Sequence, residues 1–278
     1  MVNAAALLLI LMHDRKAAVM HPRGANHRQT RKREALAHPQ QNRSFPEHRS
    51  NRTGPGPLKT LRSLLAAPPD PFLITGRTQR RVSELVAAVG NRATILNIGA
   101  GYTRLSERVI NVDIFDSGTT DVIASALALP FPDATADLII LQGVLEHVED
   151  ADSAVAECHR VLRPGGLFYT EMPFLQPYHE SPIDVRRSTR PGLAHLCSPL
   201  TEVDSGIHIG PASTLAWIIR ELLAVLVSGG RDTLYRRASS LIGWVVFPLK
   251  YADYFFERFS RLHTVASSCY YIGRKDIE

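Results

Sequence analysis

The chain has 278 residues, of which 45% are apolar and 21% charged, and its net charge is +5. That length suits one large folded domain with appendages. The three cysteines, Cys158, Cys197 and Cys269, are odd in number and lack metal-ligand spacing. They exclude a structural zinc and favour a reducing cytoplasm, and no metal site is expected.

The positive charge is concentrated near the N-terminus. Residues 13–62 carry twelve Lys or Arg against three Asp or Glu, a net charge of +9, whereas the rest of the chain has a net charge of −4. Large apolar residues are few between Arg15 and Gly56, so residues 1–56 are predicted to form a disordered basic tail before a folded domain over residues 57–278. Such a tail suits anionic lipid, although a solvated extension without a partner is the simpler interpretation. No specific nucleic-acid partner is predicted.

An apolar run of nine residues, Ala4–Met12, lies within this tail. It is too short to cross a bilayer as a helix, which takes about 20 residues. No Lys or Arg precedes it and no small-residue cleavage site follows it, as a secretory signal requires. We therefore expect a cytoplasmic protein.

One amphipathic helix and five strands are predicted in the first part of the domain. Apolar residues at i, i+3, i+4 and i+7 predict a helix over Thr78–Val89, which Gly90 ends. Short continuous apolar runs follow it, as is typical of strands buried on both faces of a parallel sheet. These strands are expected at Thr94–Ile98, Val109–Val112, Val122–Ile123, Leu138–Leu141 and Leu167–Met172.

A second helix is predicted between the fourth and fifth strands. It extends from about Asp152 to Leu162, with Asp150 or Asp152 as its N-cap and Pro164–Gly166 as its end. The first three strands, in contrast, are joined by segments of only about eight residues, whereas a parallel crossover normally takes about a dozen or more. The two crossover helices there are expected to be short or missing.

A turn with two glycines follows the first strand, and an acid ends the second. Gly99 and Gly101 lack a Cβ, so the main chain can approach a ligand closely, and Asp113 can accept hydrogen bonds from ribose hydroxyls. Asp113 follows Gly99 by only 14 residues, and Thr103 or Arg104 stands where a dinucleotide fingerprint needs a third glycine. NAD is therefore disfavoured. Taken alone, each glycine is better explained by a tight turn, and Asp113 by a solvated turn acid.

Three further motifs follow in order, Ala128–Asp133, Ala136–Val148 and Arg160–Leu167. Together with the glycine turn, they resemble the class I S-adenosylmethionine-dependent methyltransferases, specifically the type 11 methyltransferase domain, most strongly over Ala93–Pro173. The resemblance implies a Rossmann-like α/β fold with a seven-stranded, mostly parallel sheet, and S-adenosyl-L-methionine as the cofactor.

The resemblance also implies a set of cofactor-binding residues. The methionine end is expected against Asn97, Gly99, Ala100 and Gly101, the ribose at Asp113, the adenine beside Ser125, Ala126 and Leu127, and the transferred methyl above Gln142 and Gly143. Asn97 and Ser125 stand where the family commonly has acids. Both can accept a hydrogen bond, but without charge, so weaker cofactor binding is expected.

The C-terminal part departs from the family. The last two strands, Val203–Ile209 and Cys269–Gly273, are expected to form a hairpin, yet roughly 60 residues separate them, too many for an ordinary hairpin loop. Thr214–Val227 and Leu241–Phe256 are predicted to be helical, with breaks at Gly229–Gly230 and at Pro248. A helical insertion is therefore expected over about residues 212–264.

The insertion is rich in aromatic residues, a composition that suits an interface. With the basic tail, it is expected to contact the inner membrane surface or a lipid-linked acceptor. Packing in a core or a dimer contact is the competing interpretation, and the favoured one for Thr214–Val227. The aromatic residues are Trp217, Trp244, Tyr251, Tyr254 and Phe255.

Three residues are candidates for deprotonating or positioning the acceptor. His147 follows the fourth strand, while Tyr178 and His179 lie in the loop after the fifth, at the carboxyl edge where substrates bind. A neutral imidazole can accept a proton from a hydroxyl or an amine. The pair Arg186–Arg187 can bind an acidic group. Alternatively, His147 packs in its own loop, braced by Glu146, and the later loop is a folded lid.

We predict methyl transfer to a small-molecule, sugar or lipid-linked acceptor, with O-methylation favoured. The sugar acceptor follows from similarity to bacterial methyltransferases that occur alongside cell-surface glycan enzymes. The competing hypotheses are a non-catalytic nucleoside-binding or scaffold protein with this fold, and a nicotinamide-dependent reductase. Binding of S-adenosylhomocysteine and of NADH distinguishes the three.

Overall fold

The computed structural model describes residues 70–73, 76–179, 183–256 and 258–277. Contacts divide the chain into a first unit, Met1–Leu65, and a second, Ala66–Glu278. The predicted disordered tail and its apolar run lie outside the described residues, and they stay predictions. All the described residues belong to the second unit.

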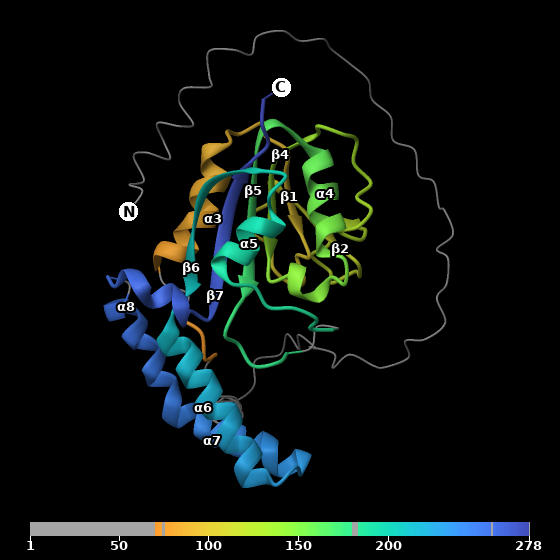
Figure 1. Cartoon of the computed structure of the whole chain (residues 1–278). Helices are drawn as coiled ribbons and strands as arrows, with labels where there is room; N and C mark the ends of the chain where they lie inside the picture. Colours follow the sequence, from red (N-terminus) through yellow and green to blue (C-terminus); the bar gives the residue numbers. More distant parts are fainter. Residues whose placement is uncertain (1–69, 74–75, 180–182, 257, 278) are drawn as a thin grey trace. The chain divides into compact units, whose positions relative to one another are not determined.

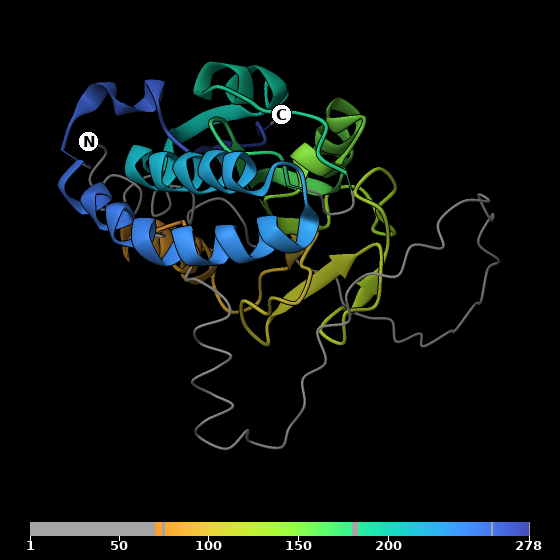
Figure 2. The same cartoon turned by 90° about the horizontal axis from the view of Figure 1, so that it is seen from below.

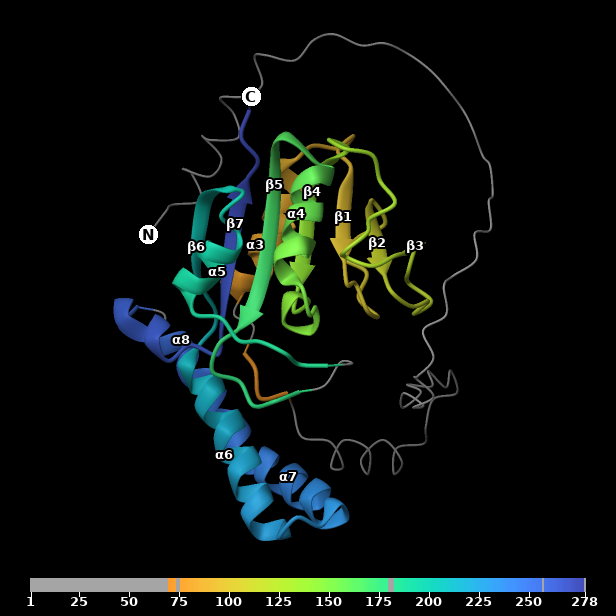
Figure 3. The same cartoon turned by 45° about the vertical axis from the view of Figure 1, so that its right-hand side comes forward.

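Seven strands form one sheet in the described part of the chain (Figures 1 and 3). Their order is β3-β2-β1-β4-β5-β7-β6, and β7 is antiparallel to both of its neighbours while the other pairs are parallel. The predicted fold class, the five early strands and the terminal hairpin are confirmed. The strands are β1 (Ile95–Ile98), β2 (Val109–Asp113), β3 (Val122–Ile123), β4 (Ala136–Gln142), β5 (Leu162–Pro173), β6 (Thr201–Ile209) and β7 (Ser268–Arg274).

Helices cover both faces of the sheet. In Figures 1 and 3, α4 (Ala151–Val161) and α5 (Arg190–Leu196) lie on one face, and α3 (Gly76–Ala88) lies on the other. The carboxylate of Asp150 accepts a hydrogen bond from the Ser153 backbone N–H at 3.0 Å, which makes Asp150 the N-cap of α4, as predicted.

Helix α5 was not predicted from the sequence, because its seven residues are too few to show a periodic pattern. The hydroxyl of Thr189 accepts a hydrogen bond from the Gly192 N–H at 3.2 Å and caps its first turn. Leu193 is the buried residue that attaches α5 to the core.

The two faces of the sheet differ in polarity. Leu96 and Ile98 of β1 belong to the apolar core that α4 and α5 complete. Side chains alternate along a strand, so Asn97 between them faces the α3 side. Gln142 of β4 and Glu171 of β5 are partners in the strand register, and both lie outside that apolar core. Polar groups therefore gather on the α3 face, near the carboxyl ends of the parallel strands.

The first two crossovers contain no helix in the described structure, as predicted. Arg104 holds these connections in place. Its guanidinium donates to the backbone carbonyl of Thr119 at 2.9 Å and to the carboxylate of Asp121 at 2.7 Å. An ion pair and carbonyl contacts thus take the place of a packed helix in ordering both loops.

A helical insertion separates β6 from β7, as predicted. Its two long helices, α6 (Pro211–Ser228) and α7 (Asp232–Val246), lie side by side (Figure 2). The predicted break at Pro248 is confirmed, whereas the predicted helix start at Leu241 was wrong. Helix α7 begins nine residues earlier and ends at Val246, because Pro248 cannot continue an α-helical hydrogen-bond ladder and starts a new turn instead. The remaining elements are η3 (Phe247–Ala252), α8 (Asp253–Phe256) and η4 (Ser260–Thr264).

A buried carboxylate joins the ends of the insertion. Asp253 of α8 accepts hydrogen bonds from the backbone N–H groups of Ala212 and Ser213, at 2.8 and 3.0 Å, and from the Ser213 hydroxyl at 2.6 Å. The N-cap residue of α6, Gly210, has no side chain to do so. Asp253 therefore caps α6 from 40 residues away in the sequence.

Candidate active site

A cavity of about 1460 Å³ opens at the carboxyl ends of β1 and β4, on the α3 side of the sheet. Residues from the glycine turn, the ends of β4 and β5, the following loops, α3 and α6 contribute to its wall. The wall includes Asn97, Gly99, Ala100, Gln142, Gly143, Glu146, His147, Glu171, His179, His208 and Trp217.

The glycine turn has the geometry that only glycine tolerates. Gly99 and Gly101 have φ angles of +67° and +54°. A Cβ on Gly99 would stand 2.5 Å from a methyl carbon of Val144, a position that real side chains do not occupy. The N–H groups of Gly99 and Ala100 point to the carbonyl of Val112, at 2.8 and 3.3 Å. Gly99 and Ala100 of this turn line the cavity.

Asp113 does not line the cavity in this structure. Its carboxylate is buried and accepts a hydrogen bond from the Gly101 N–H at 2.7 Å, so the turn closes over the acid. The predicted adenine residues Ser125, Ala126 and Leu127 also lie outside the cavity wall. Of the ten residues predicted to bind the cofactor, five line the cavity, namely Asn97, Gly99, Ala100, Gln142 and Gly143.

The two amide side chains of the predicted cofactor site are held by neighbouring strands. Asn97 donates to the Asn111 amide oxygen on β2 at 3.1 Å, and Gln142 donates to Glu171 on β5 at 3.1 Å. Both amides are thus fixed in orientation at adjacent strand ends. This arrangement suits the precise placement of a polar ligand beside the glycine turn.

Glu171 and His208 form a buried pair in the cavity wall that the sequence analysis missed. The His208 Nε2 lies 3.0 Å from the Glu171 carboxylate, which also accepts a hydrogen bond from the Tyr169 hydroxyl at 2.5 Å. Burial alone would raise the pKa of Glu171, but His208 and the hydrogen bonds outweigh it and hold that pKa below its usual value. An acid inside the otherwise apolar β5 was the signal in the sequence.

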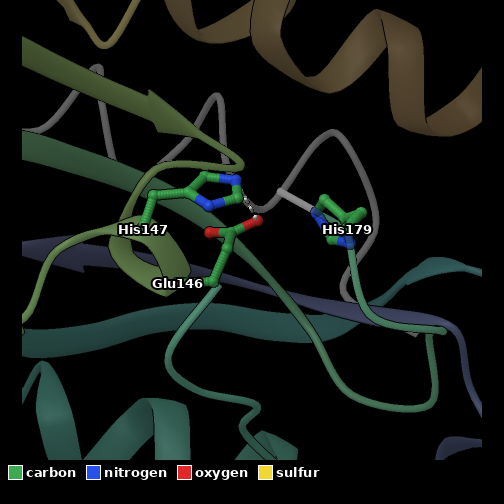
Figure 4. A group of neighbouring side chains, drawn as sticks. All are labelled: Glu146, His147 and His179. Atoms are coloured by element: carbon green, nitrogen blue, oxygen red, sulfur yellow. Dashed lines mark ion pairs between the residues drawn. The ribbon is translucent and has the colours of Figure 1, made fainter. Parts of the chain in front are cut away.

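Glu146, His147 and His179 come together in the wall of the same cavity (Figure 4). Their nearest oxygen and nitrogen atoms all lie within 4.8 Å of one another. Glu146 is only 2% exposed, and burial raises its pKa to about 7. Among the described residues, its Oε2 atom has no hydrogen-bond partner. The expectation that Glu146 merely braces its loop does not account for this oxygen.

The two histidines are each held through one ring nitrogen. His147 Nδ1 lies 2.6 Å from the carbonyl oxygen of Ile183, and its Nε2 lies 4.0 Å from Glu146. His179 lies with its Nδ1 3.5 Å from the buried carboxylate of Asp184, and burial lowers the pKa of its imidazole. The rings are 5.3 Å apart, edge to face. Both predicted histidines therefore belong to one site.

The third predicted catalytic residue, Tyr178, lies elsewhere. Its side chain is 65% exposed and does not line the cavity. Consecutive side chains in an extended segment point to opposite sides, and His179 takes the inward position. The prediction that Tyr178 positions the acceptor is corrected accordingly.

Arg186 and Arg187 make structural contacts. Arg187 forms an ion pair with Asp184 and donates to the carbonyl of Gln176, and Arg186 donates to the carbonyl of Glu149 at 3.0 Å. The loop after β5 is thus cross-linked to itself and to the loop after β4. We assign both guanidinium groups to bracing the site, not to binding an acidic acceptor as the sequence had suggested.

Helix α6 contributes Trp217 to the cavity wall. Its ring lies 5.7 Å from that of His179 and 4.6 Å from that of Phe72. Trp217 is 8% exposed, so it does not belong to an outward aromatic face as the sequence had suggested. The insertion therefore contributes to the cavity wall through Trp217.

Comparisons with known proteins agree with this geometry. Residues 76–170 match a family model described as a methyltransferase domain. A probable S-adenosylmethionine-dependent methyltransferase from Mycolicibacterium smegmatis is 33% identical over 99 residues, which are 33% of this chain and 33% of the relative. A ubiquinone/menaquinone biosynthesis C-methyltransferase from Hahella chejuensis is 34% identical over 92 residues, 33% of this chain and 36% of the relative. The match thus spans about a third of the length of these curated relatives.

Among solved structures, a putative sarcosine dimethylglycine methyltransferase from Galdieria sulphuraria superposes with a TM-score of 0.46 and 15% sequence identity. The superposition covers 75% of this chain and 92% of that one.

Proposed function

This chain belongs to the class I S-adenosylmethionine-dependent methyltransferases through its methyltransferase domain, and from that premise we propose that it methylates an oxygen atom of a small-molecule, sugar or lipid-linked acceptor. One observation carries the proposal. The cavity lined by Gly99 and Ala100 of the glycine turn is also lined by Glu146, His147 and His179, so the donor and acceptor groups share one cavity.

The donor side of the cavity fits S-adenosylmethionine. Gly99 leaves the backbone bare where a Cβ would already collide with Val144, and the amides of Asn97 and Gln142 stand fixed beside it. These groups bind and orient the amino-acid part of the cofactor. The cofactor supplies an electrophilic methyl group on a positively charged sulfur. The ionised carboxylate of Glu171, hydrogen-bonded to Gln142, favours a positive charge at this end of the cavity.

The acceptor side is formed by His147, His179 and Trp217. Two imidazoles with fixed ring orientation offer hydrogen-bond acceptors to an incoming hydroxyl, and the indole of Trp217 offers an apolar face. Methyl transfer is an in-line displacement, so the residues of this wall act chiefly by orientation. Oxygen is favoured as the acceptor atom because these groups match a hydroxyl.

The insertion supports a contact with the membrane surface. Helix α6 is long and apolar enough to span a bilayer by length and composition, although 39% of it is buried inside the protein. Figures 1 and 3 show the α6–α7 pair extending beyond the end of the sheet. Arg231, Arg236 and Arg237 are exposed at the start of α7, next to exposed apolar residues of α6. Those residues are Leu222, Leu223, Val225, Leu226 and Val227.

An exposed apolar surface with adjacent arginines suits the interface of an anionic bilayer. We therefore assign the α6–α7 pair to peripheral binding at the inner membrane surface, in a cytoplasmic protein that reaches a lipid-linked acceptor.

Two measurements test the proposed function. Calorimetry with S-adenosylhomocysteine should show binding at one site per chain, whereas NADH should not bind. S-adenosylmethionine carrying an isotope-labelled methyl group should then deliver label to metabolites, glycans or lipids of a bacterial extract. Label on oxygen supports the proposal, and label on carbon or nitrogen would refute the choice of acceptor atom. Binding without any transfer would point to a nucleoside-binding protein instead.

A further inference from the structure

The cluster of Glu146, His147 and His179 offers the ligands of a metal centre, and we propose that it binds one divalent transition-metal cation, which holds the oxygen atoms of the methyl acceptor. The contact of the ion with the acceptor rests on the proposed function, because it concerns the acceptor side of the same cavity. Binding of the ion by the three side chains does not depend on that function.

The spacing of the three residues suits a shared ion. Glu146 and His147 lie in η2 (Leu145–His147), directly after β4, and His179 lies in the loop after β5 (Figure 4). Their ligand atoms lie within 4.8 Å of one another. Ligands at about 2.1 Å from a tetrahedral ion are roughly 3 to 3.5 Å apart. Side-chain rotations that draw the three groups together by about one ångström therefore complete the site.

The state of Glu146 is the independent reason to place a ligand here. Its carboxylate is 2% exposed, and Oε2 has no partner among the described residues. Leaving a carboxylate buried without a partner costs several kcal/mol, and native structures normally satisfy such groups. The buried acid of β5, Glu171, shows the contrast, since three side chains donate to or pair with it. A cation is the partner that Glu146 lacks.

Both imidazoles are presented as metal ligands usually are. A carbonyl oxygen only accepts, so the 2.6 Å contact of His147 Nδ1 with Ile183 places the hydrogen on Nδ1 and a lone pair on Nε2. His179 Nδ1 lies beside the carbonyl of Pro177 at 3.3 Å and the carboxylate of Asp184 at 3.5 Å. These two acceptors outweigh one donor, Arg187, at 3.4 Å.

Such outer contacts fix the tautomer and orientation of metal-binding histidines. The positive charge of Arg187 does not oppose a cation strongly, because Asp184 pairs with it.

The ligand set indicates the kind of ion. Two imidazole nitrogens and one carboxylate suit Zn²⁺, Mn²⁺, Fe²⁺ or Co²⁺, whereas Mg²⁺ and Ca²⁺ prefer oxygen ligands alone. Three protein ligands leave open coordination positions, and all three residues line the cavity. An acceptor with two adjacent oxygen atoms, such as a vicinal diol of a sugar or a carboxylate, fits those positions.

The sequence analysis predicted no metal because it looked for cysteine spacing. The proposed ligands come from two different loops, so no local motif marks them.

The test measures cation binding directly. Chelator-treated full-length protein is titrated with Zn²⁺, and in parallel with Co²⁺, whose visible absorption reports coordination. We expect one ion per chain. Glu146→Gln, His147→Ala and His179→Ala should each weaken the affinity at least tenfold and change the Co²⁺ spectrum. Glu146→Gln is nearly isosteric and removes a buried charge, so it keeps the fold. His195→Ala and Glu149→Gln, both at exposed positions, are the matched controls and should behave as wild type.

Wild-type stoichiometry and affinity in all three variants would overturn the inference, as would the absence of a bound ion in the wild-type protein. S-adenosylhomocysteine calorimetry on the chelated protein separates the two proposals. S-adenosylhomocysteine binding without cation binding refutes the metal centre alone. Cation binding without S-adenosylhomocysteine binding refutes the proposed function alone.

Discussion

The carboxylate of Glu171 on β5 and the imidazole of His208 on β6 meet 3.0 Å apart, although β7 lies between their strands. Both side chains lean across the face of β7 toward the cavity. A register shift that moved either residue by one position along its strand would turn its side chain to the other face of the sheet. The contact between these two side chains therefore depends on the register of β5, β7 and β6 together.

Glu171→Gln should lower the free energy of unfolding by about 1 to 3 kcal/mol at pH 7, because the donors around it lose a charged acceptor. The pKa of Glu171 is lowered in the folded protein, so its contribution is present above the ordinary value of 4.5 and is lost as the pH falls through the folded value. Urea unfolding at several pH values checks this. The difference between wild type and variant should narrow below pH 4.5, whereas Glu202→Gln, at an exposed position of the same sheet, should show little difference.

Gly99→Ala should weaken S-adenosylhomocysteine binding at least tenfold, since the new methyl group would displace Val144 or the turn itself. Gly229→Ala is the matched control. That glycine also has a positive φ, +54°, but no atom lies within 4 Å of its added Cβ. Calorimetry measures both. If the collision is the cause, adding Val144→Ala to Gly99→Ala should restore part of the affinity.

Asp253→Ala should destabilise the insertion, because two backbone N–H groups and one hydroxyl at the start of α6 lose their acceptor. We expect a loss of about 1 to 3 kcal/mol, visible as a lower Tm and as faster amide exchange in α6. Asp232→Ala, at an exposed acid in the first turn of α7, should cost less. Equal Tm values for the two variants would contradict the capping role of Asp253.

Leu226→Gln should reduce flotation of the protein with anionic vesicles, because an apolar contact at the bilayer interface is replaced by an amide. Ile123→Gln is the control, since Ile123 is 63% exposed against 67% for Leu226 but lies on β3. Wild-type protein that remains entirely in the soluble fraction at low salt would remove the membrane contact from the proposal.

Most strands of the sheet could be predicted from local patterns in the sequence. The run Leu138–Leu141 is continuous and apolar, and Ile95–Ile98 is apolar apart from Asn97, because both sheet faces are covered. Both strands were therefore recognisable without long-range information. The start of α7 was missed because Asp232–Val246 mixes polar and apolar residues and packs chiefly against α6. The packing against α6 that stabilises α7 cannot be recognised in the sequence of α7 itself.

The site was only partly predictable for the same reason. Gly99 and Gln142 lie in motifs of the family, and the structure places them in the cavity. The pairing of Glu171 with His208 depends on two residues far apart in the sequence. Likewise, nothing near Trp217 in the sequence indicates that it lies beside His179. Contacts of this kind are decided by how the insertion folds back.

The insertion leaves and rejoins the sheet at a single rung, where Ile209 of β6 is the register partner of Ser268 of β7. The distance between these two points is fixed by strand pairing, whatever lies between them. Loops of different length closing the same gap differ little in entropy. The segment between Ile209 and Ser268 could thus be exchanged for one of a different length. Because Trp217 belongs to this segment, replacing the segment would change that part of the cavity wall, whereas the wall residues Asn97, Gly99 and Gln142 lie outside it.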